Sequence, residues 1–134
     1  KWGGWWRKQH VGNHHIKCYP EKKFTRPPPY YNYLELHEDG NIWLFAIPDV
    51  ISCFCLASST LELIALLIYS YTILSREEFL HKTIHTTPNM FEKNRYFKVL
   101  REVHFEHHRG KMKCNYGFSE PVFDYVFGTL VLPK

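Results

Sequence analysis

Apolar residues concentrate in one long segment of the chain, residues 42–74, which is interrupted by Pro48 and Asp49 and by a polar group at residues 58–60. Each half of this segment is shorter than the roughly 20 residues that a membrane-spanning helix needs. The segment can be drawn as one membrane span or as two short ones. Because both flanks are expected on the same side of the bilayer, we favour two crossings or a helical hairpin with its turn at residues 58–60, which enters at a shallow depth or with a tilt and then returns. The alternative is a hairpin buried in the core of a soluble protein.

The basic side chains avoid this apolar segment. No Lys or Arg occurs between Pro27 and Ser75, and the two flanks hold all 17. This distribution is expected where the middle of a chain enters a bilayer and both flanks stay on its cytoplasmic side. Against 13 acidic residues the net charge is only +4, which is too small to indicate nucleic acid as a partner.

The second half of the chain carries two further helical patterns. Ser75 and Glu78 have the spacing of a capping box, which predicts a helix that starts or restarts at Ser75 and stops before Pro88. Residues 89–109 predict the next helix, because apolar residues and histidines recur there every four positions. We therefore expect an all-α fold, in which a membrane helical hairpin carries a cytosolic helical cap.

Eight of the nine histidines fall into three clusters, whereas His37 stands alone and is expected to be an ordinary structural residue. Within the clusters, spacings of three and four residues place rings on one helical face. Imidazole suits iron, zinc, copper and nickel, and eight rings exceed the four ligands of one tetrahedral zinc ion. The clusters thus predict a two-metal site, with the candidate ligands His10, His14, His15, His81, His85, His104, His107 and His108.

The three clusters are expected to converge on one site. The two later clusters lie on helices joined by a turn at residues 86–88, so their five rings should face common metal. The first cluster has to reach them from across the hairpin, which requires both flanks on the same side of the membrane. Ligating histidines usually donate their second N–H to an acceptor, and the nearby carboxylates are Glu77, Glu78, Glu106 and Asp124.

Other kinds of catalytic site lack support in the sequence. There is no Gly-x-Ser-x-Gly motif for a nucleophilic serine and no Gly-rich loop for phosphate. The four cysteines show no Cys-x-x-Cys spacing, which argues against a disulfide framework and against a zinc site made of thiolates.

The histidine motifs resemble those of the fatty acid hydroxylase/sterol desaturase superfamily. Residues 104–108, followed by residues 115–117 and 123–129, are similar to its C-terminal signature, in which His-x-x-His-His precedes Tyr-Gly and then Trp-Asp-x-x-Phe-Gly-Thr. Residues 81–88 and 10–15 are similar to the two histidine motifs that come before it. The resemblance covers essentially the whole chain and is strongest over its second half.

Two features depart from the family pattern. Phe123 stands where the family usually has Trp. The family's first histidine pair, on an upstream helix, would precede Lys1, so we expect the chain to be the C-terminal part of a longer protein. The chain itself is expected to form one domain, residues 1–134, with its apolar hairpin at about residues 42–74.

The resemblance implies an integral membrane, non-haem di-iron oxygenase of lipid metabolism. Such an enzyme uses O₂ and external electrons to hydroxylate or desaturate a fatty acid, sterol or sphingolipid. It implies that the clustered histidines hold two iron ions, which zinc can replace in a purified form, and that cytochrome b5 or a ferredoxin-type protein supplies electrons. The implied location is the endoplasmic reticulum membrane, with the histidines on the cytosolic side, or the inner membrane of a bacterium.

Two alternatives come from other functional classes. The first is a non-catalytic relative of the same fold that binds zinc for structure alone. The second is a soluble, histidine-rich metal-storage domain, which requires the apolar segment to be soluble. Residue patterns also leave open the lipid substrate and the choice between hydroxylation and desaturation, because pocket shape sets both.

Overall fold

The computed structural model describes residues 4, 8, 10–20, 22–25, 46–109, 113–117 and 119–133. Within these ranges the chain forms helices and loops and no β-strand, which confirms the all-α prediction for this part of the chain. Its helical elements are η1 (His10–Cys18), α2 (Ala46–Leu56), α3 (Thr60–Ile84), α4 (Arg95–His108) and α5 (Val122–Val126). His37 lies outside the described residues.

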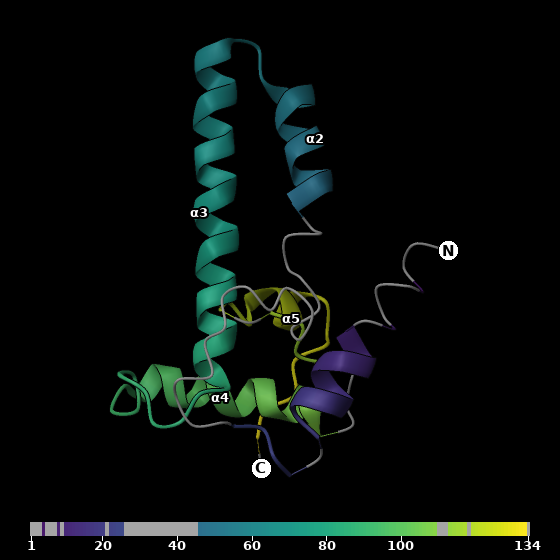
Figure 1. Cartoon of the computed structure of the whole chain (residues 1–134), viewed down its shortest axis with the longest axis vertical. Helices are drawn as coiled ribbons and strands as arrows, with labels where there is room; N and C mark the ends of the chain where they lie inside the picture. Colours follow the sequence, from purple (N-terminus) through teal and green to yellow (C-terminus); the bar gives the residue numbers. More distant parts are fainter. Residues whose placement is uncertain are drawn as a thin grey trace.

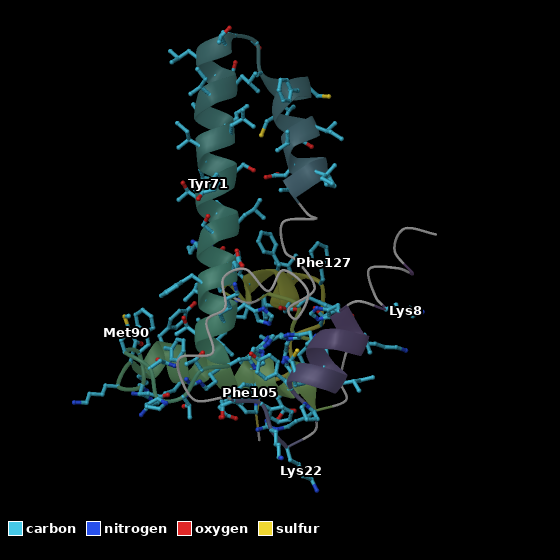
Figure 2. The ribbon with its side chains drawn as sticks, viewed as in Figure 1. Lys8, Lys22, Tyr71, Met90, Phe105 and Phe127 are labelled. Carbon is cyan, nitrogen blue, oxygen red and sulfur yellow. The ribbon has the colours of Figure 1, made fainter. Side chains whose placement is uncertain are left out.

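The helices α2 and α3 form an upright hairpin above a base that contains η1, α4 and α5 (Figure 1). The predicted turn is confirmed, since α2 ends at Leu56 and α3 begins at Thr60. Between the two helices, the Ser70 hydroxyl donates a hydrogen bond to the Asp49 carboxylate. Apolar side chains project outward along both helices (Figure 2), and Leu61, Ile68 and Phe54 are each more than half exposed.

Among the described residues, no helix has both the length and the apolar character required to span a membrane. The helical hairpin itself is confirmed, whereas its insertion into a membrane stays a prediction.

The helix start predicted at Ser75 is wrong. The helix α3 runs without a break from Thr60 to Ile84, so Ser75 lies inside it. The capping function belongs to Ser59, whose hydroxyl accepts a hydrogen bond from the Glu62 N–H at 3.2 Å. Because a cap binds only N–H groups that have no partner in the preceding turn, the same Ser-x-x-Glu spacing has no capping role in mid-helix.

The following helix, α4, begins six residues later than predicted. The Asn89 amide donates to the carbonyls of Thr83 and Thr86 and accepts from the Phe91 N–H, which holds residues 89–91 in a turn. Asn94 then caps the helix by accepting from the Phe97 N–H at 3.1 Å. Asparagine favours such local bonds over a helix interior, and this competition shortens α4 at its start.

A small core joins the end of α3 to α4. Ile84, Phe97 and Phe105 form the buried cluster, and Phe24 and Phe91 pack against it. The buried guanidinium of Arg101 donates to both carboxylate oxygens of Glu92 and to the Thr86 carbonyl. These contacts tie α4 to the turn after α3, so the last turns of both helices are held beside each other.

Candidate metal centre

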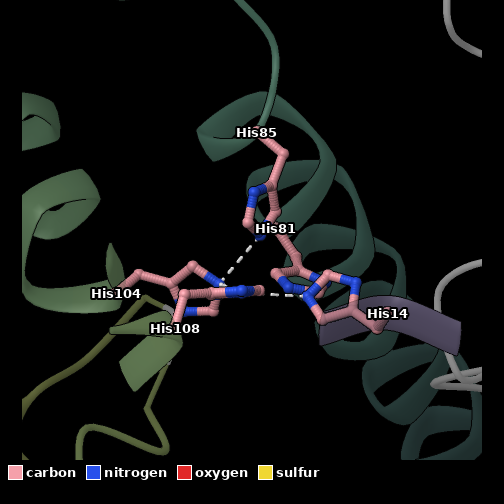
Figure 3. Close-up of side chains that lie close together, drawn as sticks. All are labelled: His14, His81, His85, His104 and His108. Carbon is pink, nitrogen blue, oxygen red and sulfur yellow. Dashed lines mark hydrogen bonds between the residues drawn. The ribbon is translucent and has the colours of Figure 1, made fainter. Parts of the chain in front are cut away.

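Three helical elements bring the clustered histidines together at the base of the hairpin. The segment η1 supplies three rings, the end of α3 with its C-cap residue supplies two, and the last turns of α4 supply three. Figure 3 shows five of these rings pointing toward one another from the three elements: His14, His81, His85, His104 and His108.

These five rings form the first group, and all five residues are buried. Their ligand nitrogens lie within 4.8 Å of one another. The closest Nε2 pairs are His85 with His104 at 3.0 Å, His104 with His108 at 3.1 Å, and His14 with His108 at 3.1 Å. His81 and His85 at the end of α3, like His104 and His108 in α4, are four residues apart, so each pair lies on one face of its helix.

His10, His15 and His107 form the second group, whose ligand nitrogens also lie within 4.8 Å of one another. The Nε2 atoms of His10 and His15 are 3.1 Å apart although the residues are five positions apart. An α-helix would not stack residues at this spacing, but η1 is a π-helix, in which bonds run from residue i to i+5. The two groups adjoin, because the rings of His15 and His108 stack at 4.1 Å.

The structure thus confirms the predicted convergence: all eight candidate histidines lie in two adjoining groups. Whether they bind metal stays a prediction. The split between the groups was not foreseen, because an α-helical interpretation of residues 10–15 gives no reason to separate His14 from its neighbours.

Backbone carbonyls set the orientation of two rings. The Nδ1 atom of His85 lies 2.6 Å from the Phe24 carbonyl, and that of His107 lies 2.7 Å from the Cys114 carbonyl. A carbonyl only accepts, so each Nδ1 carries the proton and each Nε2 keeps its lone pair for the centre. This arrangement of an outer acceptor and an inner lone pair is typical of metal-binding histidines.

Two of the four carboxylates expected in this role, Asp124 and Glu77, bind other groups. Asp124 accepts from the Tyr116 and Gly117 N–H groups, and Glu77 accepts from Arg76 and from the Ser119 hydroxyl. At His85 and His107 main-chain carbonyls take the place that the sequence assigned to acidic side chains. No side-chain pattern could reveal them, since every residue carries a carbonyl.

Burial keeps the rings neutral. Loss of solvation, followed by the charge of His107, lowers the pKa of His10 to about 4, and burial with the charge of His10 lowers the pKa of His15 to about 3. Burial also lowers the pKa of His14, His81 and His104 far below 6.5, and neighbouring imidazoles lower it further. Neutral imidazole is the form that binds metal.

Tyr19 also belongs to this centre, although the sequence did not single it out. Its buried ring stacks on His85 with the centroids 3.8 Å apart and meets His14 edge to face at 5.0 Å. A signal was present, because Tyr19 follows His15 by four residues, but aromatic residues are too frequent in this chain for that spacing to stand out.

In a comparison with protein families, the family model described as fatty acid hydroxylase matches residues 1–129. No curated protein and no solved structure matches the chain.

Proposed function

The chain belongs to the fatty acid hydroxylase family, and from this premise we propose that it is a membrane-bound di-iron oxygenase that hydroxylates or desaturates a lipid. The observation that carries the proposal is the pair of adjoining histidine groups at the base of an apolar hairpin. Family membership supports an oxidoreductase in general, and the two groups support two metal ions.

The residues present fit iron better than a purely structural zinc ion. Two nitrogens bound at right angles to one ion by bonds of about 2.1 Å lie about 3.0 Å apart, against about 3.4 Å for tetrahedral bonds of that length. The closest Nε2 pairs in the first group are 3.0 and 3.1 Å apart. Three such close pairs among five imidazoles are compatible with a six-coordinate ion, and nitrogen-rich sites of this kind suit iron.

Each group has a separate role in the proposal. His14, His81, His85, His104 and His108 hold one ion, and the other is held by His10, His15 and His107. Iron bound there would provide the redox chemistry by which O₂, together with two external electrons, oxidises an unactivated C–H bond. The protein's own contribution is to keep the rings neutral by burial and, at His85 and His107, to fix the proton on Nδ1.

The hairpin is the proposed route for the lipid. Apolar side chains are exposed on both α2 and α3, and large exposed apolar surfaces mark membrane or partner contacts. The helix α3 runs from this apolar surface directly into His81 and His85. A lipid lying along the hairpin would therefore point toward the end of α3 that carries two of the histidines. We further propose that an external protein such as cytochrome b5 or a ferredoxin supplies the electrons.

The test is reconstitution of the chain with Fe²⁺ under anaerobic conditions, followed by O₂, an electron donor and membrane lipids. We expect oxidised lipid by mass spectrometry, and we expect His107→Ala and His108→Ala to abolish it. The matched control is His37→Ala, outside the three clusters, which should keep activity. Tight zinc binding without any lipid oxidation under these conditions would instead favour the non-catalytic zinc-binding alternative.

A further inference from the structure

A buried polar clamp lies beside the second histidine group, and neither the proposed metal ligands nor the core accounts for it. Asn115 is fully buried, and its amide donates to the carbonyls of Val103 and Val131, both at 2.8 Å, while its oxygen accepts from the Val131 N–H at 2.7 Å. Every hydrogen-bonding position of this side chain except one acceptor lone pair is thereby used. Asn115 joins α4 to the C-terminal segment.

Asp124 completes the clamp from α5. Its buried carboxylate accepts from the N–H groups of Tyr116 and Gly117 at 2.9 and 2.8 Å and from the Thr129 hydroxyl at 2.7 Å. The turn at residues 115–117 is thus held from both sides. We refer to Asn115, Asp124 and these bonds as the C-terminal clamp.

The clamp fixes the peptide unit that orients His107. The Cys114 carbonyl, which accepts from His107 Nδ1 at 2.7 Å, is bonded directly to the nitrogen of Asn115. That nitrogen also donates to the Thr129 carbonyl at 3.1 Å. Rotation of the peptide would break both bonds at once, so its carbonyl keeps one direction while the clamp is intact.

We propose that Asn115 and Asp124 are positioning residues that set the metal affinity of the second group selectively. His107 belongs to that group and is oriented by the clamped peptide, whereas the clamp reaches the first group only at the Val103 carbonyl, next to His104 in α4, and binds none of its rings. This inference rests on the proposed function, since it presumes one metal ion in each group. Loss of an outer hydrogen-bond partner typically weakens metal affinity 10- to 100-fold.

The experiment is a titration of the metal-free chain with Co²⁺, in which visible absorption reports the ligand set and calorimetry reports stoichiometry and affinity. We expect two equivalents for the wild-type chain. Asn115→Ala should keep the first equivalent and bind the second at least about tenfold more weakly. Asp124→Asn and Thr129→Val, which preserve size, should give the same pattern and serve if Asn115→Ala does not fold.

The matched control is Asn89→Ala. The Asn89 side chain also donates to two carbonyls and accepts from one N–H, but it lies in the turn after α3, away from the second group. This variant should lose thermal stability yet keep the affinity and spectrum of the second equivalent.

Two results would overturn the inference while leaving the proposed function intact: clamp variants that bind both equivalents normally, or clamp variants that weaken both equally, as general destabilisation would. A wild-type chain that binds fewer than two equivalents overturns the two-metal proposal itself, and the inference with it.

Discussion

At the scale of single residues, burial and one carbonyl acceptor decide what an imidazole can do. His107 keeps its Nε2 lone pair for the centre because the Cys114 carbonyl binds its Nδ1 proton, and His85 does the same through Phe24. Burial then keeps the rings neutral in the pH range where a solvent-exposed histidine becomes charged. Both effects prepare the rings to bind metal. Keeping the rings neutral costs folding free energy when no metal is bound.

That cost predicts a pH dependence of the metal-free chain. Above pH 6.5, histidines are neutral in the folded and the unfolded chain, so they contribute no slope. Below pH 6.5 the unfolded chain takes up protons that the folded chain refuses until His10 titrates near 4 and His15 near 3. The unfolding free energy should therefore fall with falling pH between about 6.5 and 4, by about 1.4 kcal/mol per pH unit for each excess proton.

Denaturation of the metal-free chain in detergent at pH 7.5, 6 and 5 measures this slope. The double variant His10→Gln, His15→Gln should show a shallower slope than the wild-type chain. A stability that is flat over this range, or that rises as the pH falls, would contradict the neutral, buried state of the rings.

Gly117 offers a second prediction at this scale. A Cβ atom placed there would lie 2.6 Å from the Glu120 carbonyl oxygen and 3.1 Å from Asp124 Oδ2. Gly117→Ala must therefore push the turn away from the clamp, and we expect it to destabilise the chain by about 1–3 kcal/mol. Thermal unfolding measures the loss. The matched substitution Gly12→Ala, where no atom lies within 4 Å, should have little effect.

At the scale of elements, periodicity predicted the helical class and the shared face of the histidines in α3 and α4, and the polar interruption at residues 58–60 predicted the hairpin turn. These features follow from local spacing, which the sequence displays directly. The start of α4 and the π-helical form of η1 were not predictable in this way. In the first, Asn89 prefers local bonds to the turn, and in the second, contacts with the other rings stabilise a form that local propensity disfavours.

The corrected cap of α3 gives a matched pair of substitutions. Ser59→Ala removes the hydroxyl that accepts from the Glu62 N–H, and we expect a loss of about 1 kcal/mol in unfolding free energy. Ser75→Ala, in the interior of α3, should be neutral or slightly stabilising because alanine has the higher helix propensity. Chemical denaturation of both variants separates the two positions, and a larger loss at Ser75 would restore the original prediction of a cap there.

At the scale of the whole molecule, the hairpin places an apolar surface at one end and the histidine groups of the candidate metal centre at the other. The apolar part of α3, residues 61–74, is about 21 Å long at 1.5 Å per residue, against about 30 Å for the hydrocarbon core of a bilayer. A hairpin of this length suits entry from one face and return to it. In that proposed arrangement the base would stay at that face; Tyr125 on α5 and its C-cap residue Phe127 are exposed.

This arrangement predicts that η1 and α4 lie on the same side of the membrane, because rings from both meet in one centre, with Nε2 of His14 and His108 3.1 Å apart. Lys8 precedes η1, Lys98 lies on α4, and both are exposed. In sealed vesicles containing a cysteine-free chain, Lys8→Cys and Lys98→Cys should react equally with a membrane-impermeant maleimide.

A chain that keeps only Cys55, which is exposed on α2, should react after detergent is added and not before. Labelling of Lys8→Cys and Lys98→Cys from opposite sides would be incompatible with the shared centre in a membrane, and equal labelling of Cys55 without detergent would remove the hairpin from the bilayer.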